Sequence, residues 1–164
     1  EKQLTEAKTA TGSPIDSGSG LPLGTRAPSF DLPLLAGDRA SLNTLTAAGR
    51  PVLLVFSSSF CAACAALWPD IGRWQRDHAR MLTIAVVGTG SAQVLETKLM
   101  GTDVQDVLLA DDSQLLEAYR VPGIPSAVVV GADGKIDSEA VMGPAAIRKL
   151  VQARVGTLPA TGRS

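Results

Sequence analysis

The sequence is poor in residues that bind metals, and it lacks long apolar and basic runs. Its only cysteines are Cys61 and Cys64, and its only histidine is His78. A structural zinc site takes four ligands, so a complete site within this chain is not expected. No segment approaches the ~20 consecutive apolar residues of a membrane-spanning helix. No basic run is present, and the formal net charge is only -1. We therefore expect no metal, no cofactor and no nucleic-acid partner.

The length of 164 residues suffices for one compact domain with a tail. Residues 1–23 are rich in Thr, Ser, Gly and Ala, a composition typical of a flexible linker or tether. We expect one domain over residues 24–155 and a C-terminal tail over 156–164. The chain begins with Glu1 rather than Met, so the lack of a charged-then-apolar leader says nothing about a signal or anchor in a longer product.

The two cysteines stand where an apolar run meets a helical pattern. Residues 52–56 are short, apolar and rich in β-formers, and strong helix formers begin at Ala62. The pair therefore falls at a helix N-terminus, where unpaired N–H groups and the helix dipole favour a thiolate on Cys61. Cys64 follows three residues later on nearly the same face, close enough to displace a bound partner and form a disulfide. A redox pair is the leading hypothesis.

Two other roles for the cysteines stay open. A structural disulfide would close a very small ring, which removes little entropy from the unfolded chain. Two buried, unreactive cysteines are the second alternative, because free cysteine packs as a small hydrophobic side chain.

Apolar runs alternate with helical patterns along the rest of the chain, an order typical of right-handed α/β units. The first half predicts a hairpin near 30–42, a central strand over 51–56, a helix over 62–78 that contains Pro69, and a strand over 81–87. The second half predicts a helix over 92–100 capped by Ser91, a strand over 107–110, a short helix capped within 111–113 and ending near 119, a strand over 127–130, a hairpin turn over 131–134 into a last antiparallel strand from Lys135, and a helix over 144–154.

The loop over 121–126 leads directly into an apolar strand. Pro125 occupies the first strand position, where a missing N–H is tolerated. If this loop packs beside Cys61, the N–H and C=O of Ile124 can pair with an extended substrate segment as a short added strand.

Several separate motifs occur here in a family order. They are a G-x-x-A-P-x-F pattern from Gly24, the central strand over 52–56, the C-x-x-C pair at Cys61 and Cys64, Pro69 five residues after the second cysteine, a Y-x-V-x-G-x-P loop from Tyr119 to Pro125, and the turn at 133–135. Together they span roughly residues 21–153, and in them the chain resembles the thioredoxin superfamily, particularly its extracytoplasmic TlpA-like and redoxin-type thiol–disulfide oxidoreductases.

The resemblance implies an α/β, thioredoxin-like fold, with a central mixed sheet flanked by helices and an N-terminal β-hairpin extension. It implies Cys61 as the nucleophile, Cys64 as the resolving thiol, and a cis Pro125 preceded by Ile124 opposite them. Two positions depart from the family. Val55 stands where thioredoxins carry a buried acid, and Leu67 stands where TlpA-like reductases often carry glutamate. We expect Cys64 to be hard to deprotonate, because an apolar setting disfavours a thiolate.

The direction of electron flow is predicted from the residues around the pair. Ala62 and Ala63 offer no charge or hydrogen-bond donor that would stabilise the reduced thiolate. Ile124, before the proline, resembles the residue that thioredoxins carry at this position. Both features favour a reductase or isomerase over a strong oxidant. We expect protein disulfides or dithiols as substrates, a membrane electron donor, an extracytoplasmic location, and a membrane tether outside the given chain.

Two alternative functions remain. A peroxiredoxin-like thiol peroxidase shares the N-terminal motif, and Ser58 stands three residues before Cys61 as that chemistry favours, although the preceding proline is missing. A Cu(I) delivery module would hold the metal with two thiolates, but His78 belongs to the same predicted helix as Cys64 rather than to a distant segment.

Overall fold

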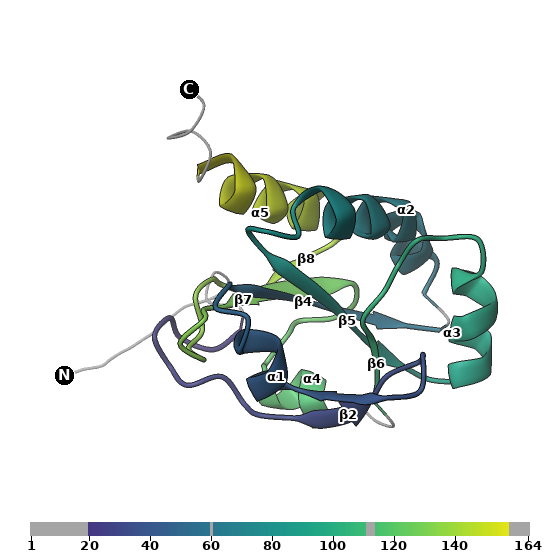
Figure 1. Cartoon of the computed structure of the whole chain (residues 1–164), viewed down its shortest axis with the longest axis horizontal. Helices are drawn as coiled ribbons and strands as arrows, with labels where there is room; N and C mark the ends of the chain where they lie inside the picture. The colour runs from purple at the N-terminus through teal and green to yellow at the C-terminus, as the bar shows by residue number, and fades with distance from the viewer. Residues whose placement is uncertain (1–19, 60, 111–113, 158–164) are drawn as a thin grey trace.

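The computed structural model describes residues 20–59, 61–110 and 114–157 (Figure 1). Most of the predicted linker and tail, and the residues 111–113 predicted as a helix cap, lie outside the described residues.

A five-stranded mixed sheet forms the centre of the fold, in the order β6-β5-β4-β7-β8. Its strands are β4 (Val52–Ser58), β5 (Thr83–Thr89), β6 (Val107–Ala110), β7 (Ser126–Val130) and β8 (Val141–Met142). Strands β4, β5 and β6 are parallel, whereas β7 pairs antiparallel with both β4 and β8. The central strands are almost wholly apolar because helices cover both of their faces.

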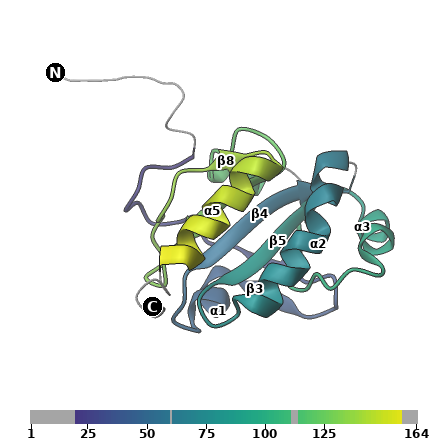
Figure 2. The same ribbon diagram turned by 90° about the horizontal axis from the view of Figure 1, so that it is seen from above.

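Helices cover the sheet from two sides. They are α1 (Leu42–Thr46), α2 (Ala62–Asp77), α3 (Ala92–Leu99), α4 (Gln114–Ala118) and α5 (Pro144–Thr157). Helices α2 and α5 lie side by side over one face, as both views show, while α1 and α4 lie on the other face (Figures 1 and 2). The fold is thus the expected α/β sandwich of a thioredoxin-like protein.

The core consists of two halves separated by the sheet, and β4 contributes to both by strict alternation. Leu53 and Val55 belong to the half under α2 and α5, whereas Leu54 and Phe56 belong to the other half. Phe56 packs on Tyr119 with ring centroids 5.6 Å apart.

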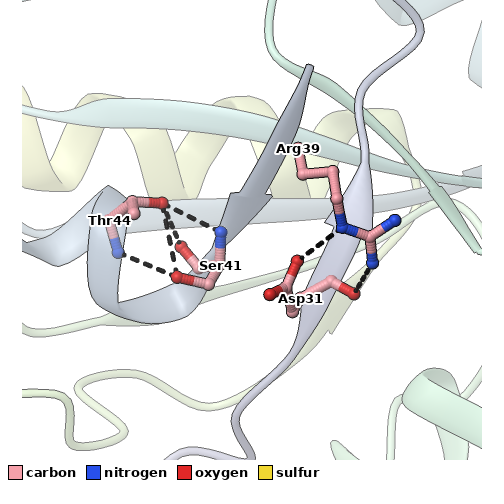
Figure 3. A network of polar contacts seen from close by, with 4 residues as sticks. All are labelled: Asp31, Arg39, Ser41 and Thr44. Carbon is pink, nitrogen blue, oxygen red and sulfur yellow. Dashed lines mark hydrogen bonds and ion pairs between the residues drawn. The ribbon is translucent and has the colours of Figure 1, made fainter. Parts of the chain in front are cut away.

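The predicted N-terminal hairpin is present as β2 (Asp31–Pro33) and β3 (Arg39–Ser41). Arg39 Nε donates to Asp31 Oδ1 at 3.0 Å across the hairpin, as Figure 3 shows. Ser41 caps α1 through a reciprocal pair of bonds with Thr44, the main-chain N–H of each residue donating to the hydroxyl of the other (Figure 3). These contacts join the two strands of the hairpin and connect β3 to α1.

One strand prediction is wrong. After the turn, Lys135 and Ile136 form only isolated bridges, and the last strand lies later, at β8. The reason is a side chain: the hydroxyl of Ser138 accepts the N–H of Val129 at 2.9 Å, where a regular hairpin would place a main-chain carbonyl. The pairing is interrupted there and resumes at Val141. Helix α5 also runs beyond its predicted end at residue 154.

Candidate active site

The two cysteines form a disulfide at the start of α2, with their Cα atoms 5.2 Å apart. Cys61 is the N-cap of the helix, and its sulfur accepts the N–H of Cys64 at 3.1 Å. Cys61 is half-buried, whereas Cys64 is fully buried in the core half under α2. One sulfur thus lies at the surface at a position that favours an anion, and the other lies directly beneath it.

The loop before β7 lies beside the same end of β4. Ser126 pairs with Phe56 in the antiparallel register, so the residues just before Ser126 adjoin the segment that leads to Cys61. The Ile124–Pro125 peptide bond is cis, as the resemblance implied. Ile124 is half-buried and packs against the core half that Cys61 also contacts.

Two hydrogen bonds hold this loop. The hydroxyl of Ser126 donates to the carbonyl of Gly123 at 2.5 Å, and the N–H of Gly143 donates to the carbonyl of Pro125 at 2.9 Å. Within the described part of the chain, the main-chain N–H and C=O of Ile124 make no hydrogen bond. Both groups therefore have unused hydrogen-bonding capacity next to the disulfide.

The described residues supply no acidic side chain in place of the two that the family carries at the positions of Val55 and Leu67. Val55 and Leu67 are fully buried in the same core half as Cys64. Across residues 20–59, 61–110 and 114–157, the buried polar side chains are all serines, at positions 57, 59, 126 and 138. His78 is the C-cap of α2, about 24 Å from its first turn at ~1.5 Å per residue. It therefore lies too far away to join the cysteines as a metal ligand, and the described residues contain no cluster of three or more metal-binding side chains.

Two residues near the site were missed by the sequence analysis. Met142 is 52% exposed on β8 and lies against the loop: a Cβ added to Gly123 would lie 2.8 Å from its sulfur. No sequence pattern predicts this contact, because it depends on the shifted start of β8. The second is Ser57, a fully buried serine near the end of β4 whose hydroxyl has no hydrogen-bond partner.

The segments that surround the disulfide carry no charge. Residues 51–69, 121–132 and 140–147 contain no Asp, Glu, Lys, Arg or His. The nearest charged side chain after the pair on α2 is Asp70, which is already bound to Arg73 at 2.6 Å and to Arg148 at 2.7 Å. Electrostatic support for a thiolate thus comes from the helix N-terminus alone among these segments.

A disulfide between neighbours in one helical turn can open and close without rearranging the rest of the domain. With this fold around it, the site defines a thioredoxin-like thiol–disulfide oxidoreductase. Comparison with protein families agrees: residues 23–139 match the AhpC/TSA family, and the chain belongs to that family.

Two curated relatives come from Bacillus subtilis. The thioredoxin-like protein YneN is 29% identical over 121 residues, covering 71% of this chain and 70% of the relative. The thiol-disulfide oxidoreductase ResA is 27% identical over 117 residues, covering 69% of this chain and 64% of ResA.

Solved structures share the fold. A thiol:disulfide interchange protein of the thioredoxin family from Chlorobium tepidum aligns with a TM-score of 0.66 at 23% identity, covering 80% of this chain and 96% of that one. A secreted disulfide oxidoreductase from Mycobacterium tuberculosis aligns with a TM-score of 0.63 at 21% identity, covering 76% of this chain and 95% of that one.

Proposed function

We propose that this protein reduces or isomerises disulfides in other proteins, with Cys61 as the nucleophile and Cys64 as the resolving thiol. The observation that supports this most directly is the position of the two sulfurs. Cys61 caps a helix at the surface and Cys64 lies beneath it in the same turn. That order suits one sulfur that meets a partner and one that releases it.

The exchange proceeds in two balanced steps. The Cys61 thiolate attacks one sulfur of a substrate disulfide and forms a mixed disulfide, while the other substrate sulfur leaves as a thiolate and takes a proton. Cys64 then loses its proton and attacks Cys61, which closes the Cys61–Cys64 disulfide and expels the second substrate thiolate. Two electrons pass from the dithiol to the substrate, and an external donor must return them.

Ile124 and Pro125 hold the substrate in this proposal. The unused N–H and C=O of Ile124 lie beside the segment that leads to Cys61. An extended substrate segment can pair with them as a short added strand, which holds its cysteine in line with the Cys61 sulfur.

The uncharged surroundings favour a substrate segment that is itself uncharged near its cysteine. Ala62 and Ala63, between the two cysteines, are exposed, and so is Met142 against Gly123. Covering such a surface with apolar groups is favourable, whereas a charged neighbour would lose water without gaining a partner.

We further propose an extracytoplasmic location and a membrane electron donor. The support is a structural relative described as secreted and the linker-like composition of residues 1–23. None of the helices in the described residues has the length and apolar character needed to cross a membrane. A membrane tether outside the given chain remains part of the proposal.

Trapping tests the roles of the two cysteines. The Cys64→Ser variant should accumulate mixed disulfides with substrate proteins through Cys61, whereas the Cys61→Ser variant should accumulate none. Equal trapping by both variants would reverse or abolish the assignment. A reduction potential near ~−270 mV together with reduction of insulin would identify a reductase, and a potential near ~−120 mV would identify an oxidant instead.

The family match and the hydroxyl of Ser58 keep a thiol peroxidase as the second candidate. Rapid consumption of hydrogen peroxide by the reduced protein, without exchange with insulin, would establish that function in place of the first. Stoichiometric Cu(I) binding with negligible disulfide exchange would instead support the copper module.

A further inference from the structure

We propose that Ser57 is a positioning residue whose hydroxyl stabilises the thiolate of Cys64 in the second step of exchange. The inference rests on the proposed function. It addresses a difficulty of this site, which has no buried acid to assist the resolving cysteine.

The alternation of β4 places the Ser57 side chain on the face toward Cys64. Leu53 and Val55 belong to the core half that contains Cys64, and the intervening residues belong to the other half. The register with β5 continues without interruption to Ser57, which lies opposite Gly88. Because side chains alternate strictly along a paired strand, Ser57 extends the row of Leu53 and Val55.

The path of α2 brings Cys64 over the end of that row. Helix α2 starts just after β4, and the following strand β5 begins beside Val52, so α2 runs back along β4. Cys64 belongs to the first turn of α2, so it lies over the C-terminal end of β4. Ser57 is the last residue of β4 on the face toward α2.

Ser57 differs from the other buried serines in its bonding. The hydroxyls of Ser59, Ser126 and Ser138 all have partners, at 3.1, 2.5 and 2.9 Å respectively. The hydroxyl of Ser57 has none, and neither has the indole N–H of Trp68, one turn after Cys64. An unpaired buried donor is rare and unfavourable unless it serves a second state of the protein.

Reduction supplies that second state. In the disulfide form, the Cys64 sulfur is neutral and has little need of a donor. During resolution, the same sulfur loses its proton and carries a negative charge until it bonds to Cys61. A hydroxyl that donates to the charged form favours it, which is the task that a buried acid performs by a different route.

Other charged groups do not account for this task. Strands β4, β5 and β7 contain no ionisable residue. The charged side chains of the two covering helices begin at Asp70 on α2, six residues after Cys64, and at Arg148 on α5. They are Asp70, Arg73, Arg76, Asp77, Arg148, Lys149 and Arg154.

A two-phase thiol assay isolates the second step, because Cys61 and Cys64 are the only thiols. The reduced full chain is mixed with one equivalent of Ellman's reagent. Attack by Cys61 releases the first equivalent of coloured thiolate, and attack by Cys64 releases the second. In Ser57→Ala, we expect an unchanged first phase and a second phase slowed about tenfold, equivalent to ~1.4 kcal/mol. The pH midpoint of the second phase should rise by about one unit.

Matched variants separate the hydroxyl from packing. Ser57→Thr and Ser57→Val have similar shapes, and only Thr should keep the second phase fast. Ser138→Ala, which removes a satisfied buried hydroxyl near the opposite end of β4, should leave the pH midpoint unchanged. The proposal would be overturned if the second phase had the same rate in Ser57→Thr and Ser57→Val. It would also be overturned if Ser57→Ala slowed the first and second phases by the same factor. Reduction of insulin by the wild-type protein tests the proposed function separately. If the wild-type protein releases both coloured thiolates from Ellman's reagent but does not reduce insulin, the proposed function is refuted. The comparison of the Ser57 variants still decides the role of Ser57 in that case.

Discussion

At the scale of single residues, buried polar groups distinguish the two halves of the core. Beneath α2, the hydroxyl of Ser57 is unpaired. On the other side of the sheet, the hydroxyl of Tyr119 donates to the carbonyl of Pro28 at 2.6 Å. The bond from Tyr119 joins two segments far apart in sequence, whereas the Ser57 hydroxyl is free to respond to a chemical change nearby. Burial alone therefore does not separate a structural group from a functional one, but the state of its hydrogen bonds does.

Tyr119→Phe should lower the free energy of unfolding by about 1 to 3 kcal/mol, because it leaves the Pro28 carbonyl without its donor while keeping the ring packed on Phe56. Burial raises the pKa of Tyr119 above its usual value of 10.0. The neutral phenol is thus the stabilising form, and its contribution is full below pH 10 and lost as the pH rises through the folded-state pKa. Urea unfolding at pH 7 and above pH 10 measures this. If the difference in free energy of unfolding between wild type and Tyr119→Phe grew with pH, it would contradict this prediction.

At the scale of elements, the sequence predicted most of the fold because local patterns decided it. The strand–helix junction at the cysteines and the cap at Ser91 depend only on neighbours in the chain, and both are present. The start of β8 could not be predicted, because the hydroxyl of Ser138 replaces a main-chain acceptor in the pairing with β7. No composition or periodicity reveals such a replacement.

The same distinction applies to the site. The two cysteines and the Ile124–Pro125 loop belong to sequence motifs, so the sequence alone predicted the cysteine pair at the helix start and the cis bond. Met142 and Ser57 do not belong to any motif. Their positions depend on the register of β8 against β7 and of β4 against β5, and register is a property of the folded sheet.

Helices α2 and α5 are joined at their surface by Asp70, which binds Arg73 within α2 and Arg148 on α5. Burial opposes ionisation of this carboxyl, but hydrogen bonds from Arg148 and Arg73 bring the pKa of Asp70 below its usual value of 3.8. Asp70→Asn should lower stability by about 1 kcal/mol at neutral pH, the scale of exposed ion pairs.

The pH dependence of that loss has a definite sign. A carboxyl with a lowered folded-state pKa stabilises the fold above its unfolded-state pKa, and this contribution is lost as the pH falls through the folded-state value. The difference in melting temperature between wild type and Asp70→Asn should therefore be present at pH 7 and shrink below pH 3.8. It should also shrink in high salt. A difference that persists unchanged at low pH would show that packing, not charge, causes the loss.

At the scale of the whole molecule, charged residues are absent from the three chain segments 51–69, 121–132 and 140–147. The chain carries 15 basic and 16 acidic residues, yet three segments around the disulfide contain no charged residue. Association with a substrate through these segments gains little from electrostatic steering. The second-order rate of insulin reduction should therefore change little with ionic strength.

Met142→Lys tests this arrangement directly, because it places one positive charge against Gly123, next to the Ile124–Pro125 loop. We expect kcat/KM for a peptide disulfide with leucine beside its cysteine to fall about tenfold, corresponding to ~1.4 kcal/mol. The rate for a peptide with glutamate in that position should rise, and this rise should disappear as salt screens the charge. Met100→Lys is the matched control, because Met100 is 73% exposed at the end of α3 and outside the segments around the disulfide. Equal effects of the two substitutions, or a leucine peptide that reacts with Met142→Lys as fast as with wild type, would show that substrates do not cover Met142.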